Sequence, residues 1–77
     1  MNKKRRKQLE AIKNQVDELK SSLDTLMDEE KGYLDNLPES WQSSETAATA
    51  EAAVSSMKQA SELLDSAMSE LEEAQNG

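Results

Sequence analysis

The sequence contains no cysteine and no histidine among its 77 residues. Without cysteine, the chain can form no disulfide and offers no thiolate to a metal ion. Without histidine, it lacks the commonest general base of enzymes and a frequent metal ligand. A glycine-rich phosphate-binding loop is also missing. We therefore expect no enzymatic activity, no cofactor and no metal site.

Long apolar runs are also lacking, since no stretch of about 18 apolar residues occurs and a membrane-spanning helix needs that length. The basic start of the chain is not followed by the apolar segment of a secretory signal. The sequence therefore predicts a cytoplasmic protein that does not enter the membrane. Proline occurs once, glycine twice and aromatic residues twice. This composition is typical of long helices.

The charge of the chain is divided unevenly along its length. The net charge is −7, but a basic tip carries +5, which leaves −12 (−7 minus 5) on the other 70 residues. The basic tip consists of Lys3, Lys4, Arg5, Arg6 and Lys7. An acidic body repels nucleic acid, so we expect at most weak nucleic-acid contact through this tip. The alternative is that the tip pairs with the acidic end of the chain, at Glu70, Glu72 and Glu73.

Two runs of apolar residues follow a heptad repeat, in which positions a and d alternate at spacings of three and four. In the first run, position a is held by Leu9, Val16, Leu23, Glu30 and Leu37, and position d by Ile12, Leu19, Leu26 and Tyr33. In the second run, position a is held by Ala50, Met57, Leu64 and Leu71, and position d by Ala53, Ala60, Ala67 and Ala74. Alanine at every d position would let two helices approach closely. Glu30 is the single polar residue in these two rows.

A break separates the two runs. Pro38 disfavours helical geometry at Leu37 and removes a backbone donor, so the first helix should end near Asp35 or Asn36. A serine, Ser43 or Ser44, is a natural cap for the second helix. We predict one domain over residues 1–77, with helices at about 3–36 and 44–76 and a turn at about 37–43.

The fold class predicted from these features is all-α, namely an antiparallel two-helix hairpin that resembles a coiled coil. If a residues of one helix meet d residues of the other, the numbers of every facing pair, such as Leu19 and Leu64, add up to 83. This pairing places the turn at Trp41, where Pro38 also places it. The alternative is one continuous helix that forms a coiled coil between molecules.

A lone hairpin leaves one side of each seam residue in contact with water, which favours an oligomer. Five residues at position e of the two helices are apolar, and we expect them to form a flank that joins two hairpins into a four-helix bundle, with the stems of Lys13 and Lys20 over its edges. The flank consists of Met27, Leu34, Ala47, Val54 and Met68. The alternative is that the methionines only widen the hairpin core. Trp41, at the turn, is expected either to plug the open end of a bundle core or to be a binding hot spot.

The chain resembles a loose group of small bacteriophage and mobile-element proteins of unassigned function. The likeness lies in the opening Met1-Asn2-Lys3-Lys4-Arg5-Arg6-Lys7, in the central Asp35-Asn36-Leu37-Pro38-Glu39-Ser40 with Gln42 and Ser44-Glu45 after it, and in the helical repeat beyond. The resemblance implies a helical hairpin and a bacterial host cytoplasm, and it implies no activity.

Three functions are consistent with these features. The first is a homo-oligomeric interaction module, such as a phage accessory protein, whose partners are a second copy and a host or phage protein. The second is an acidic inhibitor of a host nucleic-acid-binding or defence protein, which would imitate the charge of a nucleic acid. The third is nucleic-acid tethering through the basic tip. The sequence favours the first and predicts interaction at Met27, Leu34, Val54, Met68 and Trp41.

Overall fold

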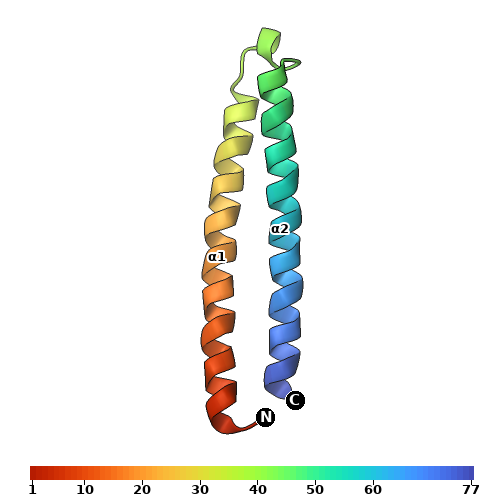
Figure 1. Cartoon of the computed structure of the whole chain (residues 1–77). Helices are drawn as coiled ribbons and strands as arrows, with labels where there is room; N and C mark the ends of the chain where they lie inside the picture. The colour runs from red at the N-terminus through yellow and green to blue at the C-terminus, as the bar shows by residue number, and fades with distance from the viewer.

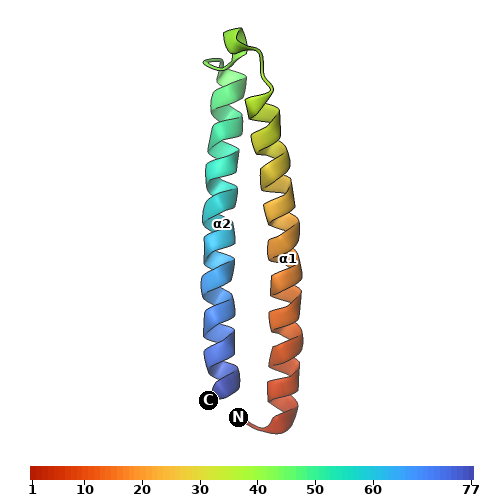
Figure 2. The same cartoon turned by 180° about the vertical axis from the view of Figure 1, so that it is seen from behind.

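Two long helices lie side by side and antiparallel in a computed structural model that describes residues 1–77 (Figure 1). Helix α1 spans Lys3–Asp35, and helix α2 spans Glu45–Asn76. A short 3₁₀ turn, η1 at Glu39–Trp41, lies between them. The molecule is all-α, as the heptad runs predict, and the view from behind shows the same hairpin (Figure 2). Both chain ends lie at the end opposite the turn.

Side chains cap the start of both helices. The Asn2 side chain accepts a hydrogen bond from the backbone N–H of Arg5 at 2.8 Å. The Ser44 hydroxyl accepts one from the N–H of Ala47 at 3.2 Å. Each cap satisfies one of the backbone donors that a helix start leaves without a helical partner. Ser44 is one of the two serines that the sequence indicates for this position.

Helix α1 ends at Asp35, where Pro38 predicts that it should end. Asn36 follows α1, and its backbone N–H and side-chain amide both donate to the carbonyl of Gly32. Pro38 then takes an extended conformation, with ψ at 146°, and directs the chain across the end of the hairpin. The η1 turn closes with the N–H of Trp41 donating to the carbonyl of Pro38 at 2.8 Å. The direction change therefore occurs at residues 36–44.

The molecule is a thin rod, with Cα extents of 59 × 14 × 12 Å. Only Ala47, Ala50 and Ser61 are buried. The large residues of the seam, which is the line of contact between α1 and α2, are half-buried, because each meets one neighbouring helix only. The seam therefore runs the length of the rod without forming an enclosed core.

The seam is rotated from the expected position. Residues at a and e lie half-buried or buried between the helices, whereas the d residues of α1 are exposed. The half-buried and buried e residues are Lys13, Lys20, Met27, Leu34, Ala47, Val54, Ser61, Met68 and Gln75. The prediction of an a/d seam is therefore wrong. The helix pair uses a and e, and position d faces solvent except at Ala60 of α2, which is half-buried.

The axial register differs slightly as well. The interacting pairs Asp24 and Ser61, Lys20 and Asp65, and Lys13 and Glu72 have residue numbers that add up to 85, where the sequence predicts 83. The physical reason for the rotation lies in the same contacts. Turning position e inward brings the two lysines and Ser61 beside carboxylates of the opposite helix. A seam centred on d would point these groups away from their partners.

Candidate protein-interaction face

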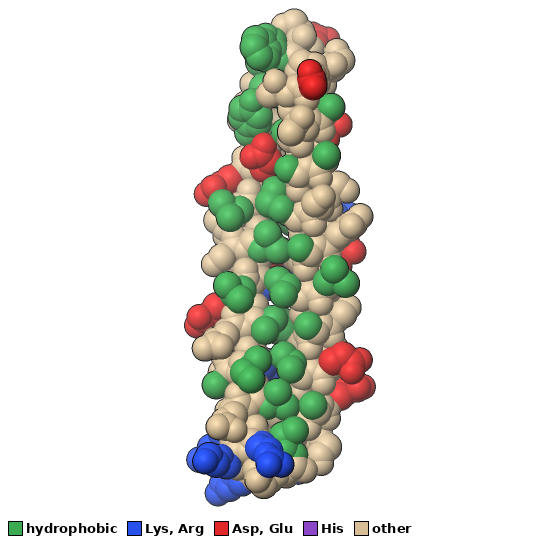
Figure 3. Space-filling view, in the orientation of Figure 1, with side chains coloured by type: hydrophobic (Ala, Val, Ile, Leu, Met, Phe, Trp, Pro, Cys, Tyr) green, Lys and Arg blue, Asp and Glu red, His purple; other side chains and the backbone are tan.

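One side of the rod carries two parallel rows of apolar residues, here called the open face. The row on α1 consists of the large residues Ile12, Leu19, Leu26 and Tyr33, and the row on α2 consists of Ala53, Ala60, Ala67 and Ala74. The large side chains are between 46% and 63% exposed. Figure 3 shows that apolar side chains run over both helices for most of the rod on this side. Exposed large apolar residues in a contiguous patch are typical of protein contact surfaces.

The open face contains a hollow near the turn. It is lined by Glu30, Tyr33, Glu45, Thr46, Thr49, Ala50 and Ala53. The hollow exists because α2 presents alanine and threonine here, and because the a position of α1 is held by the half-buried Glu30 rather than by leucine. An apolar or aromatic side chain that entered this hollow would contact Ala50 and Ala53 at its floor and Tyr33 at its edge.

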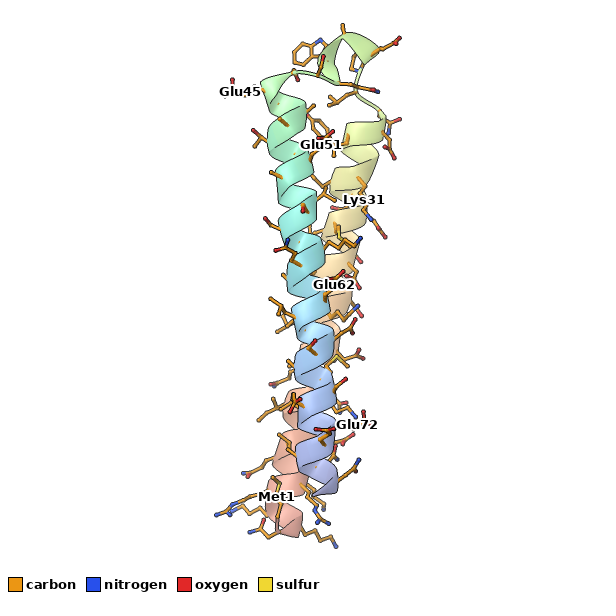
Figure 4. All side chains as sticks on the ribbon, turned by 90° about the vertical axis from the view of Figure 1, so that its right-hand side faces the viewer. Met1, Lys31, Glu45, Glu51, Glu62 and Glu72 are labelled. Atoms are coloured by element: carbon orange, nitrogen blue, oxygen red, sulfur yellow. The ribbon has the colours of Figure 1, made fainter.

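The opposite side of the rod, here called the polar face, carries the interhelical polar contacts. The Ser61 hydroxyl donates to Asp24 Oδ1 at 2.6 Å. Lys20 Nζ lies 2.9 Å from Asp24 Oδ2 and 3.7 Å from Asp65 Oδ2. Gln75 donates to Glu10 farther along the rod. Charged side chains such as Lys31 and Glu72 project to this side (Figure 4).

Two ionisable groups on the polar face have shifted pKa values. The Ser61 hydroxyl, and then the Lys20 ammonium, hold the pKa of Asp24 below its usual range by hydrogen bonding to its carboxylate. The hydrogen bond to Asp24 raises the pKa of Lys20. Both shifts favour the charged forms, so the cluster is an ion pair with a hydroxyl donor at ordinary pH. It links the helices and offers no group that titrates near neutrality.

The apolar flank expected at position e lies inside the hairpin. Met27, Leu34, Val54 and Met68 are half-buried between α1 and α2, and Ala47 is buried. This placement matches the alternative interpretation, in which the methionines widen the hairpin core. The surface left open is the d side. Whether the flank residues also contact a partner stays a prediction.

Trp41 lies at the far tip of the rod, in the η1 turn, and is 54% exposed. In the single hairpin it therefore does not plug the end of the seam. Its carbonyl accepts hydrogen bonds from the hydroxyl and the backbone N–H of Ser44. These bonds fix the backbone of the tip, while the indole ring keeps much of its surface in solvent. A role for Trp41 in binding stays a prediction.

The basic start of α1 and the acidic end of α2 make fewer contacts than their opposite charges predict. The basic tip at residues 3–7 forms no ion pair with Glu70, Glu72 or Glu73. Its one hydrogen bond to the C-terminal end of the chain runs from the Arg6 guanidinium to the Gly77 carbonyl at 3.4 Å. Glu72 instead lies 3.8 Å from Lys13. The expected pairing of tip and acidic end is therefore corrected to one contact by Lys13, which lies beyond the basic tip.

The heptad pattern does not predict the polar cluster at Lys20, Asp24 and Ser61. A usable signal was present, since Lys20 and Asp24 are four residues apart and can pair along one helix. A serine at position e, level with this pair, is the remaining hint. The exposed row on α1 was also missed as a surface, because its residues were assigned to the seam.

Comparisons with known proteins add no relative, since no family model, no curated protein and no solved structure matches the chain. Neither α1 nor α2 has the length of apolar sequence that crossing a bilayer requires. The chain also lacks a cluster of three or more side chains that could hold a metal ion. The open face, with its hollow, is thus the feature on which a functional proposal can be built.

Proposed function

We propose that the chain is a non-enzymatic protein-interaction module that acts by packing its open face against another protein surface. One observation carries this proposal, namely the row of Ile12, Leu19, Leu26 and Tyr33 that α2 leaves exposed. Such a row costs solubility in a free hairpin, and a partner would bury it. The lack of histidine and cysteine supports a non-enzymatic role.

The proposal includes homo-oligomerisation and an accessory role of the phage type. Apolar residues fill nearly all a and d positions of both helices and several e positions, a pattern typical of helices that pack in bundles. The phage-type role rests on the resemblance of the opening and central motifs alone. A host or phage protein would then be the further partner, within a bacterial cytoplasm.

Affinity capture from infected bacterial lysate, followed by mass spectrometry, tests the open face as the binding surface. The tagged wild-type chain is compared with Leu26→Glu, which puts a charge into the open face. Ser21→Glu adds the same charge at an exposed position outside both rows and serves as the control. We expect wild type and Ser21→Glu to retain the same partner, including an untagged copy of the chain, and Leu26→Glu to lose it.

Equal retention by Leu26→Glu would contradict the proposal. Salt separates apolar packing from charge pairing, because screening weakens exposed ion pairs and leaves apolar burial intact. We expect the captured partner to stay bound at an ionic strength of about 1 M, where the Debye length is about 3 Å.

The second candidate function is inhibition of a host nucleic-acid-binding or defence protein by acidic mimicry. The observation that favours it is the −12 charge outside the basic tip, most of it carried by two long antiparallel helices. A basic groove would attract such a surface, and the attraction would fall steeply with salt. Loss of the partner on replacing Glu70, Glu72 and Glu73 by lysine, with retention by Leu26→Glu, would support mimicry over the apolar module.

A further inference from the structure

We infer that the occupant of the open face is a second copy of the chain, related by a two-fold axis parallel to the rod. In this dimer, α1 of each copy lies on α2 of the other, and both turns are at the same end. The inference rests on the proposed function, since it uses the open face as a binding surface. It specifies the partner and the orientation.

The exposed area of the hairpin fits an interface of ordinary size. The chain has 5730 Å² of accessible surface. A compact monomer of the same mass would have about 4,700 Å². The excess of about 1,000 Å² is close to the roughly 800 Å² that each partner buries in a standard protein interface. A face-to-face dimer would therefore bring the chain to the surface area of a compact protein.

The two rows of the open face complement each other in size. The row on α1 is large and the row on α2 is alanine throughout. A second copy placed with α1 over α2 sets each large row on an alanine row, twice by symmetry. One surface thus supplies both the projecting side chains and the spaces that receive them, which is the requirement for a self-complementary two-fold interface.

The other face-to-face arrangement has its axis across the rod. It would place α1 on α1 and α2 on α2, with the turns at opposite ends. Large residues would then oppose large residues, and alanine would oppose alanine across a gap. Voids and overpacking both destabilise a core, so this arrangement packs less well than the first.

The hollow near the turn supports the same orientation. Within one hairpin, Lys20 lies opposite Asp65, so Leu19 of a second copy placed with its turn at the same end is nearly level with Ala67. By the same register, Tyr33 of that copy is nearly level with Ala53, which lines the hollow. The hollow would thus receive the largest side chain of the row.

Sedimentation analysis of the purified full chain tests for the dimer. We expect twice the chain mass for wild type and for the control Ser21→Glu, and the mass of one chain for Leu19→Glu. Circular dichroism of Leu19→Glu should still show helix. A monomeric wild type at high concentration would overturn the inference, and so would a dimeric Leu19→Glu. If the capture experiment still retained another protein through the open face, the proposed function would stand without the dimer.

Disulfide trapping tests the orientation, and the chain has no native cysteine to interfere. Leu19→Cys and Ala67→Cys chains carrying tags of different size are mixed and oxidised. We expect the mixed disulfide as the main product, because these positions oppose each other across the dimer. Leu19 lies at the middle of α1, so the crossed arrangement would instead give the Leu19→Cys self-disulfide. That product would overturn the orientation, since a disulfide needs Cα atoms within about 7 Å.

Discussion

Asp24 is the residue through which the helices make their best-defined polar contact. One carboxylate oxygen accepts from Ser61 of α2, and the other lies against Lys20 of its own helix. Ser61 is the one buried polar residue, and no buried side-chain polar atom lacks a partner. A hydroxyl buried beside a charged acceptor specifies the axial register better than leucine against leucine does, because sliding the helices would leave it unsatisfied.

The lowered pKa of Asp24 predicts an acid-dependent contribution to stability. Its carboxylate is stabilised in the folded state, so the contribution is present above the unfolded-state pKa and is lost as pH falls through the lower folded-state pKa. We expect Asp24→Asn and Ser61→Ala to lower the Tm at pH 7. The deficit of Asp24→Asn should shrink as pH falls below the usual pKa of an aspartate, and thermal melts across this range measure it.

Asp17→Asn provides the matched control for this test. Asp17 occupies the same heptad position one repeat earlier, is exposed, and makes no hydrogen bond or ion pair through its side chain. Its replacement should leave the Tm near that of wild type at pH 7. A deficit for Asp24→Asn that stayed constant down to pH 2 would show that the carboxylate charge is not what stabilises the contact.

At the scale of the helices, α1 carries more apolar surface than one neighbour can cover. Its apolar residues lie at a, at d and, in its second half, at e, and α2 covers only the a and e sides. Helix α1 also contains a residue of low helix propensity, Gly32, in its last turn. A Cβ at Gly32 would meet no atom within 4 Å, so the glycine is not needed for packing.

Gly32→Ala is therefore expected to stabilise the protein. Alanine restricts the unfolded chain more than glycine does, which favours the helix by about 0.5–1 kcal/mol. Denaturant unfolding followed by circular dichroism measures the change in the free energy of unfolding. The reciprocal control is Ala11→Gly, at the same heptad position of α1. This substitution is expected to lower the free energy of unfolding by about the amount that Gly32→Ala raises it. Destabilisation by Gly32→Ala would mean that a partner or the turn requires the bare backbone there.

The sequence predicted the elements of this fold well and their rotation poorly. Heptad spacing and Pro38 were sufficient for two helices, an antiparallel hairpin and the place of the turn. The choice between d and e could not be made from spacing, since both positions of α1 carry residues such as Leu19 and Met27. Alanine at d of α2 packs at small cost inside or outside the seam. The deciding contacts, such as Ser61 with Asp24, depend on three-dimensional register.

The candidate site was likewise predicted in kind but not in its residues. The sequence indicated that one apolar flank remains after the hairpin forms, and the structure leaves such a flank. The residues predicted for it, Met27 and Val54 among them, instead fill the seam, while Leu19 and Leu26 remain exposed. An error of one heptad position in the seam exchanges core for surface, because neighbouring positions differ by about 100° around a helix.

At the scale of the whole molecule, the hairpin is a single layer of two helices. The large seam residues each have one side unprotected, and only three residues of 77 are buried. Ordering two helices of 33 and 32 residues costs much conformational entropy, and a single seam offsets little of it. Stability of the free hairpin is therefore expected to be low and to increase on association.

The Tm of the wild-type chain should accordingly rise with protein concentration. Association adds stability by mass action, so a hundredfold increase in concentration should move the transition upward by several degrees. Thermal melts by circular dichroism at two concentrations measure the shift, and Leu19→Glu should show none. A Tm independent of concentration in the wild type would indicate that the hairpin is stable by itself.

The placement of both chain ends at one end of the rod has a geometric consequence. The turn lies at the other end, and the rod is 59 Å long. A domain attached at residue 1 or residue 77 would therefore lie nearly this distance from Trp41. At that separation the attached domain would not cover the Trp41 side chain. The hairpin would act as a spacer with an aromatic tip.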